Sequence, residues 1–140
     1  MGELRFNTGV LVWNVNDETE ISFNPASQQF IERFLDTVEK CLKISEAEDG
    51  KKDGKDRREA FRTGRKKDAE ISAEIDSLFG DGKAAQLFAW GPTAWADGVP
   101  VWFRFAMEIL RVIKGEVTTQ KAQTSSRLEE YMEMFKEYLN

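Results

Sequence analysis

The residue types that perform most enzyme chemistry are sparse in this sequence. No histidine occurs among the 140 residues, so the commonest general base, the usual partner of a nucleophilic Ser or Cys, and the commonest zinc ligand are all missing. The single cysteine, Cys41, lies on an apolar helical stripe, which favours a small buried hydrophobe over a reactive thiol. Carboxylates and lysines remain as acid–base groups, and no motif organises them. An enzyme is therefore the least favoured of the functional classes that the residues leave open, and we expect a non-enzymatic protein without a metal site.

Two short motifs have the spacing of ligand-binding loops without the context that such loops need. Residues 49–60 place acids at positions 1 and 5 of an EF-hand loop, but Lys51 and Ala60 occupy positions 3 and 12, where calcium needs oxygen ligands. Residues 80–85 have the GxGxxA spacing of a dinucleotide-binding turn, yet they follow a predicted helix instead of a strand. Neither segment is therefore interpreted as a ligand site.

The most nearly apolar window of the chain extends from Gly98 to Gly115. As a helix over residues 100–115 it is apolar on almost every face, which is typical of a helix that packs on several sides. Its charges form one narrow stripe, made of Arg104, Glu108, Arg111 and Lys114. A membrane span needs about 20 predominantly apolar residues, more than this charged run provides. We therefore expect a central core helix and no membrane association.

Turn and capping signals divide the rest of the chain into one hairpin and four further helices. Runs of β-branched and aromatic residues around a polar turn predict a β-hairpin over residues 4–24. Asn24-Pro25, Gly80 and the capping box that begins at Ser126 mark helix ends. The expected helices cover residues 25–47, 56–79, 83–90 and 126–139, with a mobile loop at 48–55.

Length and composition favour a single domain over residues 1–140. Of these residues 41% are hydrophobic and 32% charged, which suffices for one core and a soluble surface. The expected fold class is α+β, predominantly α, with the N-terminal β-hairpin packed on a bundle of about four to five helices. One cysteine cannot form an internal disulfide, and the N-terminus lacks the apolar stretch of a signal peptide. We therefore expect a cytoplasmic location.

One carboxylate lies close to the apolar stripe of the helix predicted at 56–79. That stripe consists of Phe61, Ile71, Ile75, Leu78 and Phe79. Its spacing places Asp68 on or beside the buried face, where the carboxylate either reaches solvent or is buried and must then be paired. In the second case we expect a structural ion pair of Asp68 with Arg104 or Arg111 of the central helix, or with its neighbour Arg65.

Trp90 and Trp95 flank a turn-rich connection that leads into the central helix. Clustered tryptophans could line a ligand pocket, but no convergent set of polar groups accompanies these two. Aromatic residues at helix ends usually belong to the core. We therefore expect both indoles to anchor the connection in the core.

The last helix carries an unbroken apolar stripe opposite four glutamates. It follows a polar linker, and three longer helices already provide a core, so the stripe could bind another protein through adaptable methionine contacts. The alternative is that this helix closes the bundle. The candidate partner-binding residues are Leu128, Tyr131, Met132, Phe135 and Leu139.

Charge is unevenly distributed along the chain. Residues 51–67 contain nine Lys or Arg against three acids, a net charge of +6, while the whole chain carries −5. Clustered basic residues can neutralise phosphates, so a small nucleic-acid-binding protein is an alternative. The acidic remainder, the glycines of the basic run and the lack of a base-reading motif favour no nucleic-acid binding.

Four segments occur in an order that resembles a known family. They are Phe23-Asn24-Pro25, RKKDAEISAEIDSLFG at residues 65–80, ADGVPVWFRF at 96–105 and SRLEEY at 126–131. Together they resemble small tail proteins encoded by phages and prophages of Gram-positive bacteria, which are commonly regarded as tail assembly chaperones. The resemblance covers most of the chain, and the charged insert at residues 48–58 departs from the family pattern.

This resemblance implies a non-enzymatic tail assembly protein without catalytic residues or cofactors. It implies a chaperone-like protein that binds a helical tail component, the tape-measure protein or the tail tube, often as a homo-oligomer in the cytoplasm of the bacterial host cell. A structural component of the virion is the alternative within the same setting. The sequence leaves open the stoichiometry and the existence of a longer frameshifted form.

Overall fold

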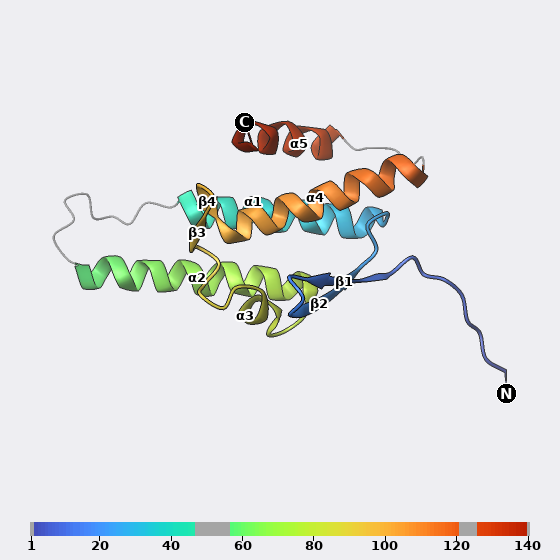
Figure 1. Ribbon diagram of the computed structural model, residues 1–140, viewed down its shortest axis with the longest axis horizontal. Helices are drawn as coiled ribbons and strands as arrows, with labels where there is room; N and C mark the ends of the chain where they lie inside the picture. The colour runs from blue at the N-terminus through green and yellow to red at the C-terminus, as the bar shows by residue number, and fades with distance from the viewer. Residues whose placement is uncertain (1, 47–56, 121–125, 140) are drawn as a thin grey trace.

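The computed structural model describes residues 2–46, 57–120 and 126–139, with side chains for 2–46, 61–115 and 130–137 (Figure 1). The predicted loop at 48–55 lies outside the described residues. The fold is α+β and mostly helical, as the sequence predicts. Within these ranges no helix combines the length and the apolar character needed to cross a membrane. The elements are β1 (Leu11–Val15), β2 (Thr19–Phe23), α1 (Gln28–Glu46), α2 (Arg57–Phe79), α3 (Lys83–Leu87), β3 (Trp95–Ala96), β4 (Val99–Pro100), α4 (Val101–Gln120) and α5 (Ser126–Leu139).

Helix α4 forms the centre of the core. Figure 1 shows it between α5 on one side and α2 and α3 on the other. Its Phe103 ring lies edge-on to Phe135 of α5 at 4.7 Å between centroids, and its Phe105 ring lies edge-on to Phe79 of α2 at 5.6 Å. The predicted charged stripe is exposed at Glu108, Arg111 and Lys114. The buried side chains of α4 are Trp102, Phe103, Ala106, Met107, Ile109, Leu110 and Ile113.

The β1–β2 hairpin turns one face toward the helices. The strands are antiparallel, with Trp13 opposite Ile21. Ile21 and Phe23 are buried, whereas Val12 on the other face is exposed. The Phe23 ring stacks on Trp13 and on Phe30 of α1, with centroids 5.3 and 4.8 Å apart. Aromatic stacking and burial therefore attach the hairpin to α1.

The hairpin is shorter than predicted, and α1 begins later. Residues 2–10 precede β1 and extend away from the body of the molecule (Figure 1). Helix α1 starts at Gln28 and not at Pro25, because Ser27 is the capping residue: its Oγ accepts the N–H of Phe30 at 3.1 Å. Asn24 instead accepts a backbone N–H two residues ahead of it, in the turn before the helix.

The end of α2, helix α3 and the hairpin are joined at one corner by polar contacts. The Asp76 carboxylate accepts the N–H groups of Gly82 and Ala84 at 3.1 and 2.8 Å. Lys83 donates to the carbonyl oxygen of Glu20 at 2.6 Å. The carboxylate satisfies N–H groups at the start of α3 that have no partner within the helix. This corner determines where the chain continues after α3.

A second hairpin precedes α4, where the sequence predicts only a turn-rich connection. β3 and β4 pair antiparallel around Asp97-Gly98, whose φ angles are 54° and 86°. Asp-Gly is a strong signal for this kind of two-residue turn. Each strand has two residues, so the flanking sequence shows no alternating pattern. The turn could be inferred from the sequence, but the strands could not.

Phe61 does not belong to the core, contrary to the predicted stripe of α2. Its side chain is 71% exposed, whereas Ile71 and Ile75 are buried. Figure 1 shows the first turns of α2 extending past the end of α1, its packing partner. The apolar stripe of α2 is therefore buried only where α1 lies alongside it.

Cys41 lies inside the core on α1, which confirms its interpretation as a small buried hydrophobe. Burial, and secondarily the negative charge of Glu74, raise the pKa of Cys41 from 9.0 to about 12. Between pH 9.0 and about pH 12 the folded chain therefore keeps this thiol protonated, whereas an unfolded chain releases the proton.

We expect the thiol of Cys41 to reduce stability in alkaline solution. The unfolded state binds fewer protons than the folded state between the two pKa values, so the free energy of unfolding falls as pH rises through this window. Urea unfolding under reducing conditions, from about pH 8 to about pH 11, should show the parent losing stability relative to Cys41→Ala. A stability difference between the two proteins that stays constant with pH would contradict the burial of the thiol.

Candidate functional site

Asp68 holds the loop between α3 and β3 against α2. Its Oδ1 accepts the backbone N–H of Thr93 at 3.0 Å and the Thr93 hydroxyl at 2.7 Å. Gly91, at φ 93°, passes so close that a Cβ there would lie 3.0 Å from Oδ2 of Asp68. The carboxylate thus joins two segments that are 25 residues apart in the sequence.

The predicted ion pair of Asp68 with Arg104, Arg111 or Arg65 is wrong. Arg104 instead lies 3.7 Å from the Asp97 carboxylate, and Arg111 lies 3.1 Å from Glu108. Within the described part of the chain Asp68 pairs with no cation, and Arg65 is exposed. Asp68 is only partly buried, and a loop amide and a hydroxyl donate hydrogen bonds to its carboxylate in place of a guanidinium.

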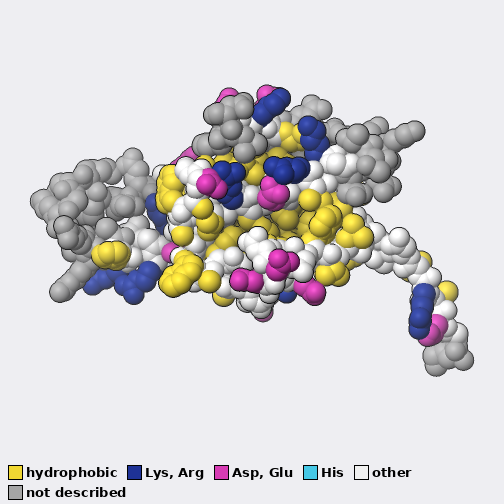
Figure 2. Space-filling view, in the orientation of Figure 1, with side chains coloured by type: hydrophobic (Ala, Val, Ile, Leu, Met, Phe, Trp, Pro, Cys, Tyr) yellow, Lys and Arg dark blue, Asp and Glu magenta, His cyan; other side chains and the backbone are white. Residues whose placement is uncertain are grey.

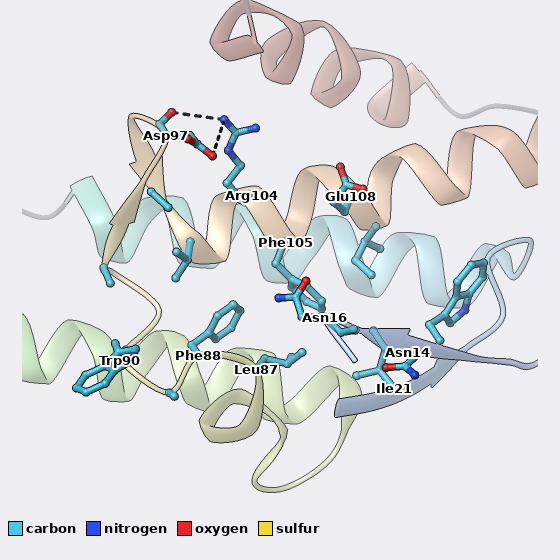
Figure 3. A pocket seen from close by; sticks show the side chains of 18 of the residues that line it. Asn14, Asn16, Ile21, Leu87, Phe88, Trp90, Asp97, Arg104, Phe105 and Glu108 are labelled. Atoms are coloured by element: carbon cyan, nitrogen blue, oxygen red, sulfur yellow. Dashed lines mark hydrogen bonds and ion pairs between the residues drawn. The ribbon is translucent and has the colours of Figure 1, made fainter. Parts of the chain in front are cut away.

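The loop held by Asp68 forms one wall of a groove of about 820 Å³. A second wall is the end of the first hairpin, residues 13–16. The third is one face of α4, marked by Val101, Phe105, Ile109 and Val112. Figure 3 shows Leu87, Phe88 and Phe105 directed toward the interior of this groove, and Figure 2 shows hydrophobic side chains across the same face of the molecule.

Polar groups lie around the groove without converging on one point. Asn14 and Asn16 belong to the hairpin, Asp97 to the turn between β3 and β4, and Arg104 and Glu108 to α4. Among the described residues no cluster of three or more His, Cys, Asp or Glu side chains could hold a metal ion. An apolar floor with scattered polar groups at the rim fits an apolar segment better than a small polar substrate.

Trp90 and Trp95 are exposed at the groove, which overturns their expected place in the core. Trp90 is 92% exposed and Trp95 is 72% exposed, and both line the groove. Trp90 points outward at its edge (Figure 3). Indole side chains are among the strongest contributors to protein–protein binding when a partner buries them. In the sequence the pair of tryptophans is the one signal that could have indicated this groove. Its position between helix ends favoured burial in the core instead.

The apolar stripe of α5 packs within the chain. Phe135 is only 3% exposed and contacts Phe103, and the Tyr131 hydroxyl donates to Glu39 of α1 at 2.9 Å. Met132 is half-buried against the same core. The side chains of Leu128 and Leu139 lie outside the described residues. For Tyr131, Met132 and Phe135 the alternative prediction holds: the helix closes the bundle, and the partner-binding assignment is corrected.

The described part of the basic segment includes one lysine with a structural contact. Lys67 donates to the carbonyl oxygen of Ser45 at 3.3 Å, in the last turn of α1. A cation at a helix C-terminus is favourable because the last carbonyls lack partners within the helix. Arg62, Arg65 and Lys66 are exposed on α2. The side chains of residues 51–60 lie outside the described part.

Neither a protein-family model, nor a curated protein, nor a solved structure matches this chain. The assignment of the groove as the candidate site therefore depends on its geometry and on its exposed aromatic residues.

We expect Asp68→Ala to release the loop that carries Trp90. Loss of hydrogen bonds to a charged group should cost about 1.5–3 kcal/mol in the free energy of unfolding, measured in urea. Asp68→Asn retains an acceptor and should lose less. Glu70→Ala, an exposed site on the same helix, is the control. Faster amide exchange at residues 90–95 in Asp68→Ala should accompany the loss, and unchanged exchange would contradict the proposed clamp.

We expect Phe135→Ala to destabilise the fold by about 3–5 kcal/mol, because it removes a buried ring from the core. Phe61→Ala removes the same ring from an exposed site and should change stability by no more than about 0.5 kcal/mol. Thermal and urea unfolding of both variants measure the contrast. A Phe135→Ala protein as stable as Phe61→Ala would restore the interpretation of α5 as a free binding surface.

Proposed function

We propose that this chain is a non-enzymatic assembly protein that holds an apolar segment of another protein in the groove between the hairpin, the Asp68-held loop and α4. The observation that carries the proposal is the exposure of Trp90 and Trp95 beside an apolar groove of about 820 Å³. Large exposed apolar side chains are unfavourable in water, and clusters of them mark interaction sites.

An amphipathic helix is the segment that this groove suits best. One wall is the row of apolar side chains on α4, and a partner helix can place its own i, i+3, i+4 and i+7 side chains along such a row. Arg104 and Asp97 at one end, and Glu108 farther along α4, provide charges of both signs at the rim. Rim charges of this kind orient a partner and contribute little to affinity.

The family resemblance supports a partner from a phage tail. Two of the segments that carry it contain residues with structural roles next to the groove: Asp97-Gly98 forms the turn between β3 and β4, and Asp76 fixes the corner from which the loop departs. We therefore propose that the partner is a tail component, foremost a helical segment of the tape-measure protein, bound during assembly in the host cytoplasm. Binding of exposed apolar helices before assembly is the action of a chaperone.

Co-expression with a tape-measure segment encoded in the same phage or prophage tests the proposal. We expect the parent to co-purify with the segment and keep it in solution. The double variant Trp90→Ser, Trp95→Ser should remain folded, because both indoles are exposed, and should bind at least about tenfold more weakly, as removal of binding hot spots does.

Phe61→Ser is the matched control, since it removes an exposed aromatic ring away from the groove. It should bind the segment as the parent does. Parent protein that neither binds nor solubilises the segment would overturn the tail-assembly proposal. Equal binding by the double variant and the parent would exclude the groove as the binding site.

A further inference from the structure

The N-terminal arm, residues 2–10, exposes apolar side chains that no described part of the same chain covers. Leu4 is 95% exposed and Phe6 is 80% exposed. The two residues are separated by one position, so in an extended chain their side chains point to the same side. The arm thus has the pattern of a strand with one apolar face and no sheet to join.

The direction of the arm is set by contacts at its base. Asn24 donates from Nδ2 to the carbonyl oxygen of Thr8 at 3.0 Å, and the N–H of Gly9 donates to Oδ1 of Asn7 at 2.8 Å. Gly9 has φ 83°, and a Cβ there would collide with the Asn24 side chain. These contacts direct the arm away from the body of its own chain (Figure 1).

Strand β1 has an open edge. It pairs with β2 and with no other strand among the described residues, and β2 separates it from α2 and α3. Its sequence, LVWNV, contains no proline and no charge. Natural edge strands use proline and charged residues to prevent pairing with another chain. An open apolar edge of this kind accepts an added strand.

We propose that a second copy of this chain supplies that strand: its arm pairs antiparallel with β1, placing Leu4 opposite Val15 and Phe6 opposite Trp13. Residues directly opposite in an antiparallel pair share a face, and Trp13 and Val15 line the groove. Leu4 and Phe6 of one copy therefore enter the groove of the other. The interaction is a reciprocal exchange of arms between two copies.

The register is consistent with two-fold symmetry. If Leu4 lies opposite Val15, then Thr8 lies opposite Leu11, and the same pairing repeats about an axis between Gly9 and Val10. Each copy gives one arm and receives one, so the assembly closes as a dimer.

The outer face of the pairing also agrees with it. Arg5 lies opposite Asn14 and Glu3 opposite Asn16, so no like charges meet across the strands.

A disulfide across the proposed pair tests the register directly. In Arg5→Cys, Asn14→Cys the two thiols of different copies are opposite each other, with Cα atoms about 4.5–5.5 Å apart in an antiparallel pair. That separation is within the range of a disulfide. We expect a covalent dimer on non-reducing gels after mild oxidation. Cys41 does not interfere, because it is buried.

The control is Arg5→Cys, Ser22→Cys, whose second cysteine is exposed on β2, one strand farther from the arm. It should form few covalent dimers. In light scattering at about 100 µM the parent should be a dimer and Leu4→Asp, Phe6→Asp a folded monomer, with an unchanged circular dichroism spectrum.

A monomeric parent, or a dimer that survives Leu4→Asp, Phe6→Asp and forms no disulfide above the control, would overturn the exchange of arms. No tail component is present in these measurements. A result that contradicts the exchange of arms therefore does not bear on the proposed binding of a tail segment in the groove, which the co-expression experiment tests.

Discussion

The packing of helix α4 is the constraint on which the rest of the structure depends. The helix is apolar around almost its whole circumference, and folding must remove those side chains from water. Helix α5 covers one side through Phe135, and the end of α2 covers another through Phe79. Val101, Phe105 and Val112 on one side of α4 are covered only in part, and the groove follows them together with the buried Ile109. A helix too apolar for its own bundle to cover thus provides the surface at which we propose that a partner binds.

A directional polar contact keeps that groove open. Apolar burial has no preferred geometry, so a loop with two tryptophans could otherwise collapse onto the row of α4. The Asp68 carboxylate prevents this by holding Thr93 against α2 through two hydrogen bonds. Gly91 is needed at the same place, because it adopts φ 93° and leaves no room for a Cβ. This attachment helps to fix the loop that carries the exposed indoles of Trp90 and Trp95.

The molecule leaves two complementary apolar features in water, an open groove and an extended arm. If a second copy inserts its arm, the arm occupies the groove in which we propose that a tail segment binds. Arm and segment would then exclude each other, so self-association would protect the apolar surface until a partner arrives. Self-association and partner binding would be alternative ways to cover the same row of α4.

The sequence by itself determined the helices, including the central one, and the first hairpin of this protein, but not the strands β3 and β4. Helical periodicity, the narrow charged stripe of α4 and the turn residues are local properties, and the helices follow them to within a few residues at most ends. Tertiary structure alone decided the use of each apolar surface. Phe135 and Trp90 both belong to apolar clusters in the sequence, yet one is buried and the other exposed. The partner of Asp68 lies 25 residues away in a loop that carries no periodic signal. The physical reason is that the type of a side chain determines whether it gains free energy from burial. Packing between distant segments determines which side chains are actually buried.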